Sequence, residues 1–291
     1  MATADAFKQQ VKRVVPHDWL VHARAVSRLR WGAKYKLARG FAAGASRRTV
    51  ISYVLLDPEL ESFSFDLHDE PGTIAALAKA LDVPAAELAR YADETRADPE
   101  LGRELARHVR WRPDAKRRMP LGSRLPWYLM VRAKKPELVV ETGIYMGLGS
   151  LAVLRALARN ADDGHPGELM SFDFSRHAGA VVRPELRGSW QRFVGPTSET
   201  LAPALDGREV GILFQDTPHT TENQTLEFGL ALTHAAPDLL LVDGSGGHAT
   251  VLEQLCREQG GTYHRTPLRS RDHIYPGADV TFGSFSRNGA G

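Results

Sequence analysis

Short apolar runs alternate with helical patterns through the second half of the chain. The first run is Leu138 to Val140, and the segment 151–157 behind it carries apolar residues at mostly helical spacing. A short β-rich run of this kind is typical of a strand buried on both faces of a parallel sheet. Comparable strand-like runs lie at 168–173, 190–194, 211–214, 238–242, 262–266 and 279–285. Strands alternating with helices predict an α/β fold with a doubly wound sheet.

Glycines mark the passage from the first run to its helix. Gly143, Gly147 and Gly149 precede Ser150, which is placed as a cap or first-turn residue. Glycine has no Cβ and accepts positive φ, so the backbone can approach a ligand closely while amides of the helix start face it. The spacing differs from the GxGxxG of dinucleotide-binding turns. Glu141 at the strand end would repel a pyrophosphate and suit a cationic amino-acid group. A purely structural turn is the alternative.

Acids also end the later strands, at Asp173, Asp216 and Asp243. Ligands of doubly wound sheets lie over the carboxyl ends of the strands, at the point where the strand order reverses. Asp173 is therefore placed to hydrogen-bond a pair of ribose hydroxyls. The alternative for Asp173 is a solvated strand end or a helix cap.

Two segments resemble one known family. The stretch VVETGIYMGLGS, 139–150, is similar to motif I of the class I S-adenosylmethionine (SAM) dependent methyltransferases, in particular to a subgroup with a VETG opening. The segment GILFQDTPH, 211–219, resembles the LFIDGDH-type segment of that subgroup and departs from it at Gln215 and at Thr217-Pro218. Over about residues 124–286 the resemblance implies a Rossmann-like sheet of seven strands, with helices between the first five and an antiparallel last strand.

The resemblance also implies a set of site residues. Those expected to bind SAM are Glu141, Gly143, Tyr145, Gly147, Ser150, Asp173, Ser198 and Asp216. For catalysis we expect His219 as the base, together with Asp216, and His248 is the second choice for the base. Three alternatives stay open: Ser198 or Thr197 caps a helix, His219 caps the helix that begins near Thr221, and Tyr145 packs without touching the cofactor.

Magnesium-binding relatives use an acid after the fourth strand and an Asp-Asp or Asp-Asn pair after the fifth. Asp216 and Asp243 match this pattern, but Gly244 stands in the second position of the pair. Two carboxylates alone make a poor site for a hard cation that prefers six or more oxygen ligands. We therefore expect no metal site in the protein, with Mg²⁺ completed by water and substrate oxygens as the alternative.

The net charge of +2 is unevenly distributed. Residues 1–48 hold eleven Lys and Arg against two Asp, a net charge of +9, so the remainder carries −7. A basic arm can bind nucleic acid or direct a protein to an organelle. Trp19 and Trp31 lie among the arginines, which favours an amphipathic helix packed on its own domain or on a second subunit of a homodimer.

The N-terminal part divides into three stretches. Residues 48–67 are strand-like, residues 69–110 predict three short helices, and a basic stretch joins them to the glycine turn. We predict an N-terminal helical or lid region at 1–120 with the basic arm, and a SAM-binding domain at 121–291. No apolar run approaches the roughly 18 residues of a membrane span, and no secretory pattern opens the chain, so we expect a cytoplasmic protein without membrane contact. The single cysteine, Cys256, lies on an apolar helical face and is expected in the core.

These features lead to one main hypothesis, a methyltransferase that passes the methyl group of SAM to an oxygen of a small-molecule acceptor, such as a secondary metabolite or a sugar-like compound. The first alternative is a nucleic-acid methyltransferase that uses the basic arm, although no NPPY-type loop follows the fourth strand. The second is a protein that binds SAM without transferring its methyl group.

Overall fold

The computed structural model describes residues 46–47, 65–102, 121–243, 249–271, 273 and 277–285. The strands are β1 (Leu138–Thr142), β2 (Glu168–Asp173), β3 (Trp190–Val194), β4 (Ile212–Gln215), β5 (Leu239–Val242), β6 (Thr262–Pro267) and β7 (Asp279–Ser284). The helices are α6 (Glu70–Leu81), α7 (Ala85–Ala97), α9 (Leu125–Lys134), α10 (Leu148–Asp162), α11 (Thr197–Leu205), α12 (Thr221–His234) and α13 (Ala249–Gln259), with 3₁₀ helices η1 (Gly122–Arg124) and η2 (Pro184–Ser189).

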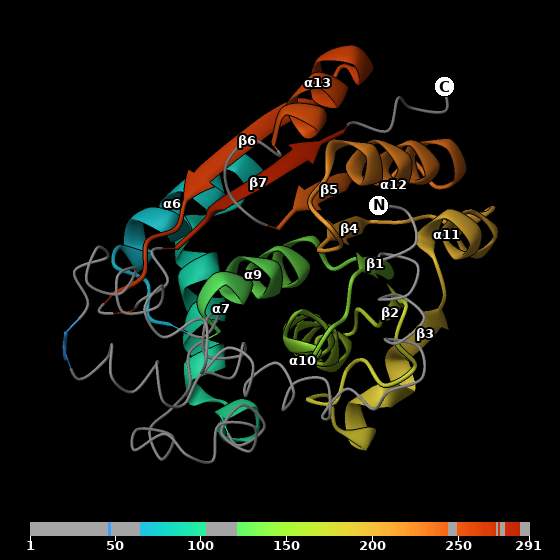
Figure 1. Ribbon diagram of the computed structural model, residues 1–291. Coiled ribbons are helices and arrows are strands. Elements are labelled where there is room, and N and C mark those ends of the chain that lie inside the picture. The colour runs from blue at the N-terminus through green and yellow to red at the C-terminus, as the bar shows by residue number, and fades with distance from the viewer. Residues whose placement is uncertain are drawn as a thin grey trace.

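All seven strands form one sheet in the order β3-β2-β1-β4-β5-β7-β6 (Figure 1). Strands β1 to β5 are parallel, whereas β7 is antiparallel to both of its neighbours, β5 and β6. The predicted seven-stranded, doubly wound α/β fold with an antiparallel last strand is therefore confirmed. The strand order reverses between β1 and β4, so the carboxyl ends of these two strands flank the switch point where ligands of such sheets bind.

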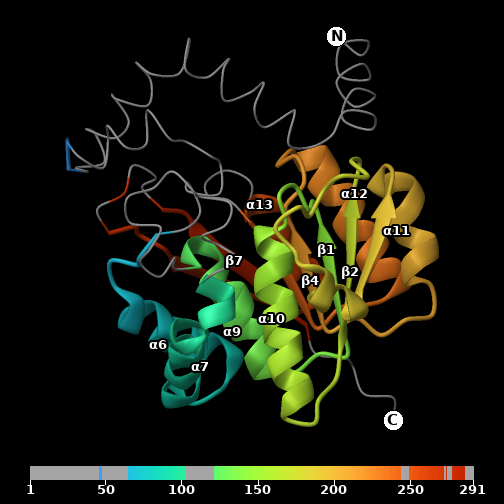
Figure 2. The same cartoon turned by 90° about the horizontal axis from the view of Figure 1, so that it is seen from below.

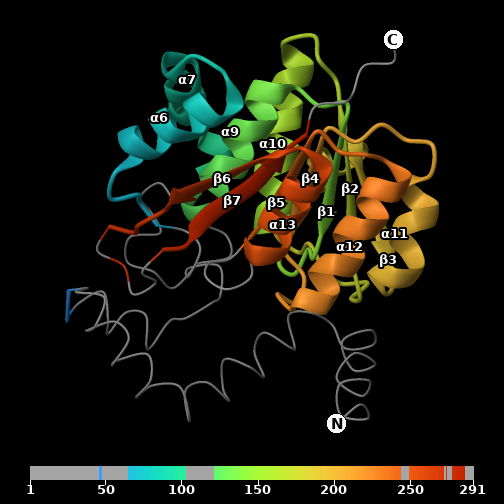
Figure 3. The ribbon, with the colours of Figure 1, turned by 90° about the horizontal axis from the view of Figure 1, so that it is seen from above.

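Alternate residues of the central strands face opposite layers of helices. Val139 and Phe214 pack with α9 and α10 on one face, while Val140 and Leu213 pack with α11, α12 and α13 on the other. Figures 2 and 3 show these helices on the two sides of the sheet. Burial on both faces explains why these strands read as continuous apolar runs.

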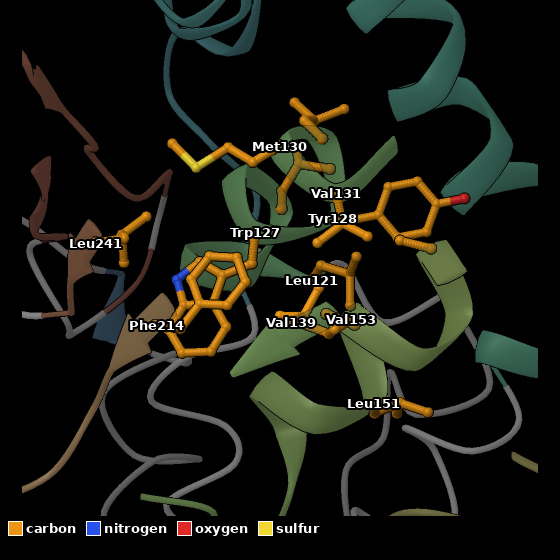
Figure 4. Packing of buried hydrophobic residues seen from close by; sticks show 14 of the residues in the cluster. Leu121, Trp127, Tyr128, Met130, Val131, Val139, Leu151, Val153, Phe214 and Leu241 are labelled. Carbon is orange, nitrogen blue, oxygen red and sulfur yellow. The ribbon is translucent and has the colours of Figure 1, made fainter. Parts of the chain in front are cut away.

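The helices α6 and α7 pack against the first of these layers. Their buried residues Leu77, Leu88 and Tyr91 belong to the same apolar cluster as α9 and α10, part of which is drawn in Figure 4. Antiparallel pairing of Leu67 with Ser270 joins this part to the chain after β6. Of the predicted strand-like stretch 48–67, the structure describes residues 65–67, and among these only Leu67 pairs with another strand-like segment. The domain boundary near residue 120 stays a prediction.

One local expectation differs from the structure. The connection between β2 and β3 carries only the 3₁₀ helix η2, so helices do not separate all of the first five strands as predicted. Pro184 opens η2, and in the described connection 174–189 no stretch continues as an α-helix. The basic arm, Trp19, Trp31, Gly244 and His248 lie outside the described residues.

Other expectations are met. Cys256 is buried on α13, and burial raises the pKa of its thiol to about 11, which keeps it protonated. Within the described residues, no helix is both long and apolar enough to cross a bilayer.

Candidate functional site

The glycine turn after β1 has the backbone geometry that its sequence predicts. Gly143 and Gly147 have φ angles of 89° and 91°, and Tyr145 between them is also left-handed with φ 49°. A Cβ on Gly143 would lie 2.1 Å from the carbonyl oxygen of Asp216. Only glycine fits here, because the turn runs directly against the end of β4.

Asp173 at the end of β2 holds this turn in place. Its Oδ2 accepts hydrogen bonds from the backbone amides of Ile144 at 3.0 Å and Tyr145 at 2.9 Å, and its Oδ1 accepts from the amide of Ser175 at 2.7 Å. Two amides of the turn, which were expected to face a ligand, are thus bonded to a carboxylate. This arrangement disfavours phosphate in that position, because the donors are taken and a negative charge stands beside them.

Glu141 lies beneath the turn with 1% of its surface exposed. Its Oε2 accepts hydrogen bonds from the hydroxyls of Ser150 at 2.5 Å and Ser171 at 2.7 Å. Burial raises the pKa of Glu141 to about 7, although both hydrogen bonds oppose the shift. Trp190 in turn donates its indole N–H to the Ser171 hydroxyl at 2.9 Å. Ser171 was not predicted, and its only sequence signal is a hydroxyl within an otherwise apolar strand.

Asp216 and Asp243 follow the adjacent strands β4 and β5 and share one cation, Arg124. The two terminal nitrogens of its guanidinium lie 2.6 Å from Asp216 Oδ2 and 2.6 Å from Asp243 Oδ1. The Arg124 side chain is 5% exposed, and its guanidinium carbon lies 4.4 Å from the ring centre of Trp127. Arg124 was read only as part of a basic connecting stretch, and no local pattern distinguishes it from the neighbouring arginines.

The pKa values of Asp216 and Arg124 are both raised above their ordinary values. Burial raises the pKa of Asp216 well above its ordinary value, and the carboxylates of Asp243 and Glu141 add to the shift, while Arg124 opposes it. Burial alone would lower the pKa of Arg124, but Asp243 and Asp216 raise it above its ordinary value. Because Asp243 and Glu141 both raise the pKa of Asp216, negative charge is crowded at this edge of the sheet, which disfavours a further anion and suits a cationic ligand.

His219 lies beside Asp216, and the catalytic role of the two residues stays a prediction. Its Nε2 lies 3.8 Å from Asp216 Oδ1, and its side chain is 34% exposed. The capping alternative for His219 is wrong, because Thr220 is the N-cap of α12. The Thr220 hydroxyl accepts a hydrogen bond from the backbone amide of Asn223.

Ser198 and Tyr145 were both predicted to contact the cofactor. Ser198 is exposed, and the N-cap of α11 is Pro196, so the capping alternative for Ser198 or Thr197 is wrong. Tyr145 is partly buried and packs against the apolar cluster. For both Ser198 and Tyr145 the contact with a cofactor stays a prediction.

A second buried carboxylate, Glu227 of α12, was missed. Its oxygens accept hydrogen bonds from three threonine hydroxyls, those of Thr142 at 2.9 Å, Thr197 at 2.8 Å and Thr217 at 2.7 Å. The periodicity of α12 carried a signal for it, since Glu227 shares the buried face with Gln224, Phe228 and Ala231. Through these bonds Glu227 links the end of β1 to the start of α11 and to the loop that precedes α12.

No group of three or more Asp, Glu, His or Cys side chains in the described ranges is arranged to hold a metal ion. The charged groups that do meet at the carboxyl edge are Glu141, Asp173, Asp216, Asp243 and Arg124, with His219 at the rim.

Residues 140–256, less than half of the chain, match the family model described as "Methyltransferase domain". The match runs from β1 into α13 and confirms, over these residues, the resemblance that the two motifs indicate. No curated protein matches the sequence.

Two solved structures illustrate what the fold is similar to. The O-methyltransferase TomG from Streptomyces achromogenes, solved with SAM, is 16% identical, with 78% of this chain and 94% of that chain covered and a TM-score of 0.43. An O-methyltransferase from Bacillus cereus, solved with SAH, is 12% identical, with 78% of this chain and 100% of that chain covered and a TM-score of 0.45.

Proposed function

We propose that this protein is a SAM-dependent methyltransferase that transfers a methyl group to an oxygen of a small-molecule acceptor. The observation that carries the proposal is the meeting of the glycine turn with Glu141, Asp173 and Asp216 at one edge of the sheet, inside the residues that match a methyltransferase domain. Similar solved proteins bear the name O-methyltransferase, which suggests oxygen as the acceptor atom.

The charges at this edge suit SAM. The ligand carries an amino group and a sulfonium, and the edge offers more carboxylates than cations. A pyrophosphate would instead meet the carboxylate of Asp173, which already occupies two amides of the turn. The residues therefore fit a cationic amino-acid group better than a dinucleotide. Asp173 ends the strand next to β1. Three backbone amides already bond to it, so about one of its roughly four lone-pair sites is left, on Oδ1, to accept a hydrogen bond from a ribose hydroxyl.

SAM supplies a methyl group on a positively charged sulfur that leaves as a neutral sulfide, so the protein has mainly to align the partners and exclude water. The rigid turn between β1 and α10 serves alignment, because Asp173 fixes two of its amides. A hydroxyl acceptor must also lose its proton as its oxygen bonds to the methyl carbon. His219 takes that proton, and Asp216 Oδ1, 3.8 Å from its Nε2, lies close enough to stabilise the charged imidazole.

The first test is calorimetric titration of the full chain with SAM and with S-adenosylhomocysteine. We expect both to bind with roughly micromolar affinity, a range that leaves product free to dissociate between turnovers. Asp173→Ala should abolish binding, and its melting temperature must be recorded, because this carboxylate also holds the turn. Absence of binding to the parent protein would refute the proposal.

Methyl transfer itself is tested by the mass of the product. Acceptors are found by the release of S-adenosylhomocysteine from SAM with a panel of hydroxylated sugars and polyketide-like compounds. A product that has gained one methyl group on oxygen supports the proposal. SAM binding without any methylated product across such a panel would favour a protein that binds SAM for another purpose.

His219→Gln should lower the rate of methyl transfer about 100-fold or more, because a general base contributes at least this much. The dissociation constant of SAM should stay within about twofold, since the imidazole acts on the acceptor. His234→Gln is the control, because His234 lies at the far end of α12 beside Asp206. An equal loss in both variants, or no loss in His219→Gln, would remove His219 from the mechanism.

A further inference from the structure

Two carboxylates face each other across the carboxyl ends of neighbouring parallel strands. The last residues of β4 and β5, Gln215 and Val242, are paired in the sheet, and each is followed by an aspartate, Asp216 and Asp243. Carboxylate oxygens held close together at such an edge are the ligands that a divalent cation prefers. Here the space between them holds the guanidinium of Arg124 instead, with one nitrogen on each carboxylate at 2.6 Å.

The guanidinium is firmly held in this place. Its contact with Asp216 is a charge-assisted hydrogen bond, and its contact with Asp243 is an ion pair. Trp127 lies 4.4 Å away on one side, and the Trp127 ring stacks on Phe214 of β4 with their centres 4.2 Å apart (Figure 4). Moving Arg124 out would leave two partly buried carboxylates without their cation, which is costly. Arg124 is thus a fixed part of the site.

Arg124 comes from a segment of the chain outside the matched methyltransferase domain. It ends η1, just before α9, and lies outside residues 140–256, which match the methyltransferase domain. The cation of the site therefore comes from the segment that precedes the matched domain, while both of its carboxylate partners come from within that domain.

We propose that Arg124 is the built-in cation of this site: it occupies the place between Asp216 and Asp243 that a divalent metal ion would otherwise take, and methyl transfer by this protein needs no metal. The part about methyl transfer rests on the function proposed above. Arg124 acts as a positioning residue, because it holds Oδ2 of Asp216 and leaves Oδ1 turned toward His219. Arg124 fixes Asp216, and Asp216 orients the base His219. Arg124 itself does not contact the acceptor.

The test begins with the unaltered full chain, stripped of metal with EDTA and titrated with MgCl₂ in a calorimeter. We expect no saturable binding at the site up to millimolar Mg²⁺, and the same dissociation constant for SAM with EDTA or with Mg²⁺. Saturable Mg²⁺ binding to this protein that disappears in Asp243→Asn would overturn the proposal without any need of an Arg124 variant.

The second arm uses Arg124→Met, which removes the cation and keeps an unbranched side chain against Trp127. The variant should lose melting temperature in EDTA and regain part of it in millimolar Mg²⁺ or Ca²⁺, because the freed carboxylates then take up the added cation. A role in packing alone predicts the loss without the recovery. Absence of recovery, or an equal rise in the parent protein, contradicts the proposal.

Two further variants separate charge from packing. Arg124→Lys keeps the positive charge and should show a smaller loss and little response to Mg²⁺. Trp127→Leu loses the stacking but keeps Arg124, so its melting temperature should fall without recovery in Mg²⁺. Titration with SAM distinguishes the two proposals, because failure to bind SAM refutes the proposed function and leaves the cation result standing.

Discussion

Glu141 places a carboxylate where water does not reach, with 1% of its surface exposed. In the folded protein the pKa of Glu141 is about 7, above its ordinary value of 4.5, so Glu141 binds a proton more tightly there. The folded state thus binds more protons between these two values. The stabilisation that comes from protonation is complete below about pH 4.5 and is lost as the pH rises through 7.

Glu141→Gln should therefore stabilise the protein most above neutral pH. We expect the free energy of unfolding of the variant, relative to the parent, to rise by about 2 kcal/mol between pH 5 and pH 8. Urea denaturation of both proteins at the two pH values measures this difference. A constant difference would mean that the Glu141 carboxylate is ionised in the folded state at both pH values.

Gly143 is limited by its neighbour and by its own backbone. Gly143→Ala should cost about 3 kcal/mol or more, because the new Cβ meets the carbonyl oxygen of Asp216 and φ is 89°. Gly229→Ala is the matched control, since Gly229 is exposed within α12 and has nothing within 4 Å of the added carbon. That control should gain about 0.5 to 1 kcal/mol. Thermal unfolding of the two variants measures both changes, and equal stabilities would disprove the close approach of Gly143 to the carbonyl of Asp216.

Among the helices, α12 connects the most parts of the site through one side chain. Glu227 accepts hydrogen bonds from the hydroxyls of Thr142 of β1, Thr197 of α11 and Thr217 in the loop before α12. Since Thr142 ends β1, Thr197 begins α11 and Thr217 lies in the loop before α12, Glu227 sets how α11 and α12 sit against the sheet.

Glu227→Gln should destabilise the protein by about 1 to 3 kcal/mol, because the amide nitrogen cannot accept and leaves at least one buried hydroxyl without its partner. Glu258→Gln is the control on α13, where the side chain is exposed and the expected change is within about 0.5 kcal/mol. Denaturant midpoints measure both. If the two variants were equally stable, the threonine hydroxyls would have other acceptors in solution.

In the whole molecule, α6 and α7 share one apolar cluster with α9 and α10. Arg132 of α9 adds a polar link, because its guanidinium contacts Glu94 of α7 at 3.0 Å and Asp163 after α10 at 2.8 Å. The N-terminal helices therefore support the helix layer that carries Arg124 and Trp127.

A chain truncated to residues 121–291 should lack a cooperative thermal transition, because removal of α6 and α7 exposes their contacts on α9 and leaves the buried Arg132 without Glu94. Circular dichroism on heating compares it with the full chain, for which one transition is expected. A truncated chain that unfolds cooperatively at the same temperature would establish residues 121–291 as an independent domain.

Much of the fold was predicted because its signals are local. Strands β2 and β3 have the bounds that alternation and turn residues predict, and the glycine turn follows β1 as expected. The acids at the strand ends could also be placed together, since carboxyl ends of parallel strands share one edge. The helix caps were predicted less well, because Thr220 competes with its neighbours for the capping position.

The amino-acid sequence by itself determined the strands, the helices and the edge at which Glu141, Asp173, Asp216 and Asp243 meet. Only the tertiary structure decided which side chain neutralises them. Arg124 precedes Asp216 by 92 positions, and nothing in the local pattern separates it from the other arginines of its stretch. A long-range ion pair depends on how distant elements cross in the fold, whereas periodicity reports only which face of one element is buried.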